Sequence, residues 1–290
     1  MLPRVFLLDK YMSYSLIFGD CLEEMKTIPD KSVNLILCDL PYGVTHNPHD
    51  KRIPFKPLWE QYERVIKDNG AIVLFAQGIF YVDLVQSNRK LFRYDLVWNK
   101  KLVTGFLNAK RMPLRSHEQL AVFYKNMPTY NPQFHEGKPL HGRGKSYMTK
   151  DMVNNNYGKF KATDDVRKGS TQKYPVSIID IPKPHPSKSE HRTEKPVDLL
   201  SWLIRTYTNE GDVVLDNCMG CGSTGVAALK ENRVFIGIEI DQEYFSTAFA
   251  RLSKIGKPDY AFSPSNIATF GETDGNGKKS EKTEIPDQCS

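Results

Sequence analysis

The chain contains the stretch Val213-Val214-Leu215-Asp216-Asn217-Cys218-Met219-Gly220-Cys221-Gly222-Ser223-Thr224, in which an apolar strand runs into a glycine turn that opens a helix. Gly220 and Gly222 allow the backbone to approach a ligand where a Cβ would collide, and the helix after them presents free N–H groups. Glu239 ends the next predicted strand, where a carboxylate can accept hydrogen bonds from both hydroxyls of a ribose. The stretch therefore indicates an α/β fold that binds an adenosine-containing cofactor, although a tight turn that only packs a strand on a helix would show the same glycines.

Apolar runs alternate with amphipathic stretches on both sides of this loop, as is typical of strands and helices that take turns in a mostly parallel sheet. The expected strands are 15–18, 33–38, 71–75, 94–98, 119–124, 213–216 and 234–239. Helices are expected at 57–67, where Asn69-Gly70 is a stop signal, and at 196–208, 223–231 and 242–254. This pattern predicts an α/β, Rossmann-like sheet.

Periodicity fades between residues 134 and 189, a segment rich in Gly, Lys, Asn and Pro that we interpret as an insertion. The predicted organisation is one half of a domain at 1–133, the insertion, the other half at 190–260, and a polar, disordered tail at 261–290. The insertion carries eleven Lys or Arg against five Asp or Glu, a net charge of +6. Such a charge is typical of phosphate contacts to nucleic acid, and a solvated lysine-rich surface would have the same composition.

The composition of the sequence limits the classes of protein to which it can belong. No apolar run approaches the roughly 20 residues that span a bilayer, and residues 1–12 lack the core of a signal peptide. We therefore expect a cytoplasmic protein without a membrane partner. Its five cysteines are expected to be reduced thiols. No metal is expected at Cys218-x-x-Cys221, because no second pair of ligands accompanies it.

A second candidate site is Asp39-Leu40-Pro41-Tyr42, which follows the buried strand predicted at 33–38. In open α/β sheets, ligands bind beyond the carboxyl ends of the strands. A carboxylate there can accept a hydrogen bond from an amino group, Pro41 fixes the turn, and an aromatic ring can stack on a flat base. Taken alone, the tetrapeptide could equally be a strand-end turn with a core tyrosine.

The order of five short segments resembles that of the beta-class amino-DNA methyltransferases, which carry a catalytic Asp-Pro-Pro-Tyr early and the cofactor loop late. The resemblance covers about residues 14 to 254, and the insertion at 134–189 matches only in role, as a target-recognition region. It implies a circularly permuted methyltransferase sheet. The segments are Gly19-Asp20-Cys21-Leu22-Glu23, Asp39-Leu40-Pro41-Tyr42, Thr193-Glu194-Lys195-Pro196, the loop from Leu215 to Thr224, and Gly237-Ile238-Glu239-Ile240-Asp241.

The resemblance implies S-adenosylmethionine as the cofactor and double-stranded DNA as the partner. It implies that Asp39 and the carbonyl of Leu40 accept hydrogen bonds from the target amino group, while Tyr42 after Pro41 stacks on the flipped base. The cofactor residues that it implies are Asp216, Gly220, Gly222 and Ser223 for the methionine part, Glu239 for the ribose, Asp20 and Cys21 for the adenine side, and Lys195 with Pro196 at the start of a helix flanking the methionine end. This chain departs from the family pattern at Leu40, which replaces the first proline, and at Cys218, which replaces a phenylalanine.

The leading Asp39 favours adenine N6 as the methyl acceptor, and cytosine N4 is the nearest alternative because it is also an exocyclic amine. A dehydrogenase would carry its dinucleotide loop in the first βα unit, and a non-catalytic DNA-binding module would leave Asp39 and Glu239 without a role. A homodimer and a cognate restriction endonuclease both stay open. Outside the insertion, the candidate DNA contacts, as a set, are Lys100, Lys101, Lys110, Arg111 and Arg115.

Overall fold

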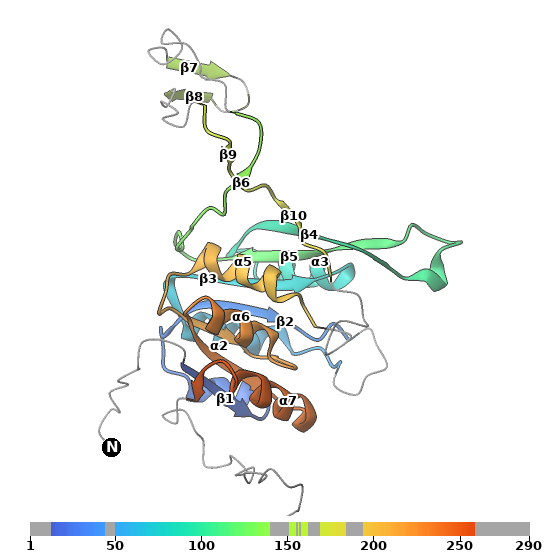
Figure 1. Cartoon of the computed structure of the whole chain (residues 1–290), viewed down its shortest axis with the longest axis vertical. Helices are drawn as coiled ribbons and strands as arrows, with labels where there is room; N and C mark the ends of the chain where they lie inside the picture. The colour runs from blue at the N-terminus through green and yellow to red at the C-terminus, as the bar shows by residue number, and fades with distance from the viewer. Residues whose placement is uncertain are drawn as a thin grey trace, which may run out of the picture.

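The computed structural model describes residues 13–43, 50–139, 151–154, 156, 158–161, 169–183 and 194–258 (Figure 1). The predicted tail at 261–290 lies outside the described residues, as do Thr193 and much of the predicted insertion. In the described part of the chain, no helix has the length and apolar character needed to cross a membrane.

A large mixed sheet forms the centre of the molecule. In the described residues it has nine strands in the order β10-β4-β5-β3-β2-β11-β12-β1-β13. All neighbouring strands are parallel except β5, which is antiparallel to both β3 and β4. The strands are β1 (Ser13–Phe18), β2 (Val33–Asp39), β3 (Ile66–Ala76), β4 (Phe92–Thr104), β5 (Arg115–Phe123), β10 (Ile178–Asp180), β11 (Val213–Asp216), β12 (Val234–Glu239) and β13 (Lys257–Pro258).

Strands from the two ends of the sequence alternate in the sheet. The late strand β11 lies between the early β2 and the late β12, and β12 in turn pairs with the early β1. This order confirms the predicted α/β sheet with permuted connections. The direction of β5 differs from a purely parallel arrangement because a short loop joins it to β4, and a short connection permits only an antiparallel return.

Helices cover both faces of the sheet (Figure 1). One apolar core lies between the sheet and α5, α6 and α7, and the other lies between the sheet and α1, α2 and α3. Because both faces are buried, the central strands are nearly continuous apolar runs, as expected for parallel strands. The helices are α1 (Cys21–Glu24), α2 (Phe55–Val65), α3 (Ile79–Ser87), α5 (Val197–Tyr207), α6 (Ser223–Lys230) and α7 (Gln242–Leu252).

The helix predicted at 57–67 ends earlier than expected, and the stop signal assigned to Asn69-Gly70 was wrong. Helix α2 ends at Val65, and both residues lie inside β3. Gly70 is explained by a close approach of backbone, since a Cβ there would lie 2.8 Å from the carbonyl oxygen of Asn34. The glycine thus permits strand packing and does not end a helix.

The segment predicted as an insertion contains short strands. β6 (His135–Glu136) pairs with β9 (Gln172–Lys173), and β7 (Asp151–Asn154) pairs with β8 (Gly158–Lys161). These two ribbons extend away from the sheet (Figure 1). Its last strand, β10, pairs with β4, so the end of this segment belongs to the main sheet.

Gly225 in α6 tests how closely the helix packs on the sheet. A Cβ there would lie 2.6 Å from the Phe235 ring and 2.7 Å from Leu252. Gly225→Ala should therefore lower the free energy of unfolding by about 1–2 kcal/mol through overpacking, although alanine normally favours a helix. Urea unfolding measures the change, with Ser246→Ala in α7 as a control expected to stay within about 0.5 kcal/mol. A stabilised Gly225→Ala variant would contradict the tight packing.

Candidate active site

The predicted site residues meet at one edge of the sheet. Asp39, Asp216 and Glu239 are the last residues of β2, β11 and β12, which are neighbours in the sheet. Gly19 follows β1 at the same edge, where its N–H donates to the carbonyl of Glu239 at 3.0 Å. Residues far apart in sequence are therefore brought to the edge where open α/β sheets bind ligands.

Asp39 and Tyr42 form the centre of the early half of the site. The Tyr42 hydroxyl donates to Oδ1 of Asp39 at 2.9 Å. The Tyr42 ring is stacked on Phe80, with the ring centroids 4.7 Å apart and the planes at 25°. Burial raises the pKa of Tyr42 well above its ordinary value, so its hydroxyl stays protonated as a donor. Phe80, which the sequence did not single out, thus holds the predicted stacking ring.

The turn after Asp39 is fixed from both sides. Leu40, at 3% exposure, packs in the apolar core with α2 and α3, which explains a leucine where the resembling family has proline. On the outer side, Nε of Arg52 donates to the Tyr42 carbonyl at 2.7 Å, and the N–H of Gly43 donates to Asp50 Oδ1 at 2.7 Å. Core burial and these bonds replace the rigidity that a second proline would give.

A buried cluster of charges surrounds Asp39. Lys195, just before α5, forms an ion pair with Oδ2 of Asp39 and another with Oε2 of Glu118 at 3.2 Å. Lys100 pairs with Oε1 of Glu118, also at 3.2 Å. Glu118 lies in β5 and Lys100 in β4, so the cluster joins three parts of the sheet to the start of α5.

The charges in this cluster set one another's protonation. Burial alone would lower the pKa of Lys195, but the carboxylates of Asp39 and Glu118 outweigh it and raise that pKa. Burial alone would raise the pKa of Glu118, but Lys195 and Lys100 lower it. Lys183 lies near the same groups, and burial together with the charge of Lys195 lowers its pKa. The two carboxylates are therefore surrounded by cations.

The structure adds a contact at Lys195 and corrects the prediction for Lys100. Lys195 was predicted to start the helix that flanks the methionine end of the cofactor, and it lies just before α5 with its ammonium against Asp39. Lys100 was included among the DNA contacts, and that prediction was wrong because its side chain is buried beside Glu118. Pro196 precedes the first residue of α5 and acts as its N-cap position.

Glu239 is held as an acceptor on the cofactor side. Its Oε1 accepts from the N–H groups of Ile240 at 3.0 Å and Asp241 at 2.8 Å, and its Oε2 accepts from Gly220 at 2.8 Å. Burial raises its pKa, and the backbone bonds oppose that rise. At Gly220, with φ +52°, a Cβ would meet no atom within 4 Å. The loop thus leaves open space beside an oriented carboxylate, which fits an adenosine-containing group.

Gly222 has a different role in the loop. Its φ is +80°, and a Cβ there would lie 2.9 Å from both Ala248 and Leu252 of α7. This glycine therefore permits the start of α6 to pack closely against α7, a packing role that was not predicted from the sequence. Of the two glycines, the geometry leaves room for a ligand at Gly220.

Asp216 is buried at the end of β11. Its Oδ1 accepts from the N–H of Cys218 at 3.1 Å, and desolvation raises its pKa to about 6. The thiols of Cys21 and Cys38 hydrogen-bond with that of Cys218. Cys218 therefore closes a cluster of small side chains at the position where the resembling family has an aromatic ring.

The remaining predicted cofactor residues already have partners within the protein. Asp20 caps α1 by accepting from the N–H of Leu22 at 2.8 Å. Ser223 is buried and donates to Glu194 at 3.4 Å, and Glu194 also pairs with Arg251 at 3.1 Å. Among the residues that the structure describes, no three His, Cys, Asp or Glu side chains gather as metal ligands.

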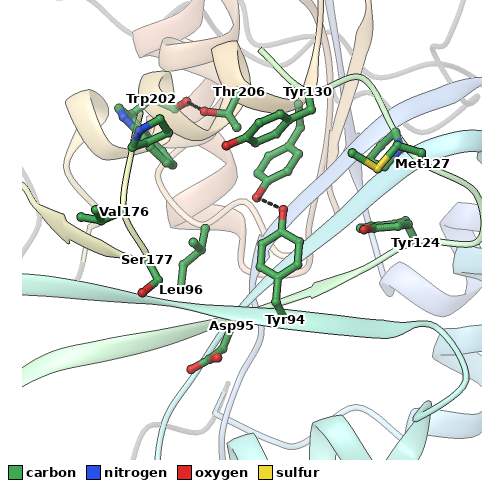
Figure 2. Close-up of a pocket in the computed structure, with 13 residues that line it drawn as sticks. Tyr94, Asp95, Leu96, Tyr124, Met127, Tyr130, Val176, Ser177, Trp202 and Thr206 are labelled. Carbon is green, nitrogen blue, oxygen red and sulfur yellow. Dashed lines mark hydrogen bonds between the residues drawn. The ribbon is translucent and has the colours of Figure 1, made fainter. Parts of the chain in front are cut away.

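A separate cavity of about 410 Å³ lies at the opposite edge of the sheet (Figure 2). Aromatic side chains from β4 and α5 line it, and the hydroxyls of Tyr94 and Tyr207 lie 2.8 Å apart across it. Tyr94 is near the start of β4, whereas the carboxylates lie at the edge where β4 ends. The cavity contains none of the predicted site residues.

Sequence reasoning missed Glu118 and Phe80. Glu118 precedes the apolar run of β5, so an acidic residue at the start of a buried strand was the available signal. Nothing in the sequence distinguishes Phe80 from other apolar residues, and its stacking on Tyr42 is visible only in the structure.

Comparisons with known proteins agree with this geometry. A family model described as DNA methylase, for the N6/N4 methyltransferases, matches residues 33–250. DNA adenine methyltransferase YhdJ of Escherichia coli K12 is 30% identical over 259 residues, covering 82% of each protein. Type II methyltransferase M.HinfI of Haemophilus influenzae is 27% identical over 274 residues, covering 84% of this chain and 69% of M.HinfI.

A solved structure shows the same fold. The crystal structure of the M1.HpyAVI–SAM complex superimposes with a TM-score of 0.54 at 22% identity, covering 82% of this chain and 99% of that one. The sheet, with its glycine loop and edge carboxylates, is that of the S-adenosylmethionine-dependent methyltransferases. Since the family model spans most of the sequence, the chain belongs to the N6/N4 DNA methylase family.

The charge cluster makes a prediction about stability. In Glu118→Ala, Lys100 and Lys195 lose a shared carboxylate while their side chains stay only 5% and 12% exposed. The free energy of unfolding should fall by about 3–5 kcal/mol, as for a buried pair that loses one partner. Urea unfolding measures it, with Asp180→Ala as the control, because the Asp180–Lys101 pair is exposed to solvent and should contribute little to stability. Equal effects of the two substitutions would disprove the role of the cluster.

Proposed function

We propose that this protein transfers a methyl group from S-adenosylmethionine to N6 of adenine in double-stranded DNA, with Asp39 as the hydrogen-bond acceptor for the target amine. The observation that carries the proposal is that the two oxygens of the Asp39 carboxylate have different partners: Lys195 binds Oδ2, and the Tyr42 hydroxyl binds Oδ1. The similarity to YhdJ, named a DNA adenine methyltransferase, supports adenine as the base.

The amino group of adenine is a poor nucleophile because its lone pair is delocalised into the ring. Hydrogen bonds from that group to Asp39 and to the carbonyl of Leu40 favour a more tetrahedral nitrogen and free the lone pair. Lys195 binds Oδ2 of Asp39, which leaves Oδ1 for the amine once the Tyr42 hydroxyl releases it. The cofactor, when bound, supplies an electrophilic sulfonium methyl group.

The base must leave the duplex to reach Asp39, at a cost of a few kcal/mol. Tyr42 offsets part of that cost by stacking, because Phe80 already holds its ring on one side. In the cofactor half, Glu239 binds the ribose hydroxyls, and Asp216, Gly220, Gly222 and Ser223 contact the methionine part. Asp20 and Cys21 lie toward the adenine of the cofactor.

The basic segment at 134–189 contacts the DNA as a target-recognition region in this proposal. Because the substrate is DNA, the enzyme works where the cell keeps its DNA, in the cytoplasm expected from the sequence. A homodimer and a cognate restriction endonuclease stay predictions, and the similarity to M.HinfI, named a type II methyltransferase, supports the second.

The experiment that tests the proposal is methyl transfer from radiolabelled S-adenosylmethionine to DNA that lacks adenine methylation. Nucleoside analysis of the product should give N6-methyladenine. If the product were N4-methylcytosine, the methyl acceptor would be cytosine and not adenine. Absence of any labelled DNA would refute the proposal.

Asp39→Ala should abolish transfer while cofactor affinity changes little, because Asp39 contacts the base and not the cofactor. We expect a loss of at least about 100-fold in kcat, corresponding to about 2.7 kcal/mol of barrier. Asp68→Ala is a control, since its pairs with Lys31 and Lys125 lie on the surface near the start of β3. Circular dichroism checks the fold of both variants. Retained methylation by folded Asp39→Ala would contradict the role of this residue.

Cofactor affinity should depend on pH through Asp216, whose pKa is raised to about 6. The ionised carboxylate binds the ammonium of the methionine part of the cofactor. The affinity for the cofactor should therefore be constant above that pKa and fall as the pH drops through it, approaching a tenfold loss of affinity per pH unit. Calorimetric titration from about pH 8 to pH 5 measures this. Asp216→Asn should bind weakly and without that dependence, whereas Glu239→Gln should keep it. A flat wild-type profile would exclude Asp216 from the ammonium site.

A further inference from the structure

Strands β4 and β5 continue past the body of the sheet as a β-hairpin, residues 101–115, which we call the finger. Thr104 pairs with Arg115 near its tip, and the turn between them contains the 3-10 helix Phe106–Asn108. β4 is parallel to β3 because β5 is antiparallel to both. The finger therefore leaves the same edge of the sheet as Asp39, and it projects well beyond the sheet (Figure 1).

The tip of the finger presents large apolar side chains to solvent. Phe106 and Leu107 are 77% and 84% exposed, and Val103, Met112 and Leu114 are exposed beside them. Gly105, with φ +87°, adopts the left-handed conformation that turns the chain just before the pair. A contiguous set of exposed apolar side chains marks a contact surface, whereas single ones do not.

Positive charge surrounds these apolar residues. The finger contains Lys101, Lys110, Arg111 and Arg115 and no acidic residue. All four side chains are exposed. Cations beside an apolar tip complement a nucleic acid, which presents phosphates outside and stacked bases inside.

The base of the finger is tied to the catalytic centre. Asp180 of β10 accepts from Asn99 at 2.7 Å and pairs with Lys101 at 2.8 Å. Lys100 and Glu118, one in each strand, belong to the buried cluster that includes Lys195 and Asp39. The exposed tip thus extends from strands whose positions are fixed relative to Asp39.

We infer that Phe106 and Leu107 form a wedge that enters the DNA duplex and occupies the space left by the target base when it rotates toward Asp39. This inference rests on the proposed function. Unstacking a base costs a few kcal/mol, and an apolar side chain inserted in the stack recovers part of that cost. Lys110 and Arg111 then contact the phosphates on either side of the inserted tip.

The test uses a duplex that contains the target sequence of the enzyme. That sequence is first identified by sequencing methylated adenines in genomic DNA treated with the wild-type enzyme. A second duplex is identical but has an abasic position opposite the target adenine. For Phe106→Ala/Leu107→Ala, kcat/KM should fall at least about tenfold on the intact duplex and within about twofold on the abasic one, because the wedge is dispensable once pairing and part of the stacking are removed.

Two matched variants separate the wedge from other effects. Met127→Ala/Val176→Ala removes comparably exposed apolar side chains, 68% and 63% exposed, beside the cavity at the opposite edge, and should change kcat/KM on neither duplex. Lys110→Gln/Arg111→Gln should weaken binding of the enzyme to both duplexes equally and reduce the dependence of that binding on salt concentration.

An equal loss on both duplexes, or no loss, for Phe106→Ala/Leu107→Ala would overturn the wedge. Wild-type activity on the intact duplex reports separately on the proposed function, since an enzyme that methylates no DNA would refute that function and the wedge with it. Cofactor binding and the urea midpoint should match the wild type, because both side chains are exposed.

Discussion

The ion pairs of Lys195 join the start of α5 to two early strands of the sheet at the edge where Asp39 lies. Lys195 stands just before α5, in the late half of the chain, while its partners Asp39 and Glu118 lie on β2 and β5 of the early half. Taking these charges out of water is costly unless each is compensated, so the arrangement persists only while all members are in place. Lys100 completes it from β4. The interaction that engages Oδ2 of Asp39 therefore also aligns the start of α5 with this edge of the sheet.

The two departures from the family pattern have structural explanations. Leu40 occupies the core below the catalytic turn, and Arg52 and Asp50 hold that turn from outside. Cys218 hydrogen-bonds with two other thiols below the cofactor loop. In both cases, residues from other parts of the chain pack around the changed position.

The candidate functional residues follow one another along the carboxyl edge of the sheet. Asp216 and Glu239 end the neighbouring late strands, and Asp39 ends the next strand along. Beyond Asp39, β4 and β5 extend as the finger with its apolar tip and cations. In the proposed function, cofactor, base and duplex approach this one edge in order, while the aromatic cavity near Tyr94 lies at the other (Figure 2).

The sequence by itself determined the local features of this protein. Periodicity and glycine placement are local properties, so they predicted strands such as β11 and β12, the glycine loop between β11 and α6, and acidic residues at strand ends. Only the tertiary structure decided which side chains meet. The contact of Lys195 with Asp39 was not predicted, Lys100 was expected on the surface and is buried, and Glu118 and Phe80 were not expected in the site at all. These contacts join strands that are neighbours in the sheet but distant in the chain, and spacing along a sequence carries no information about such neighbours.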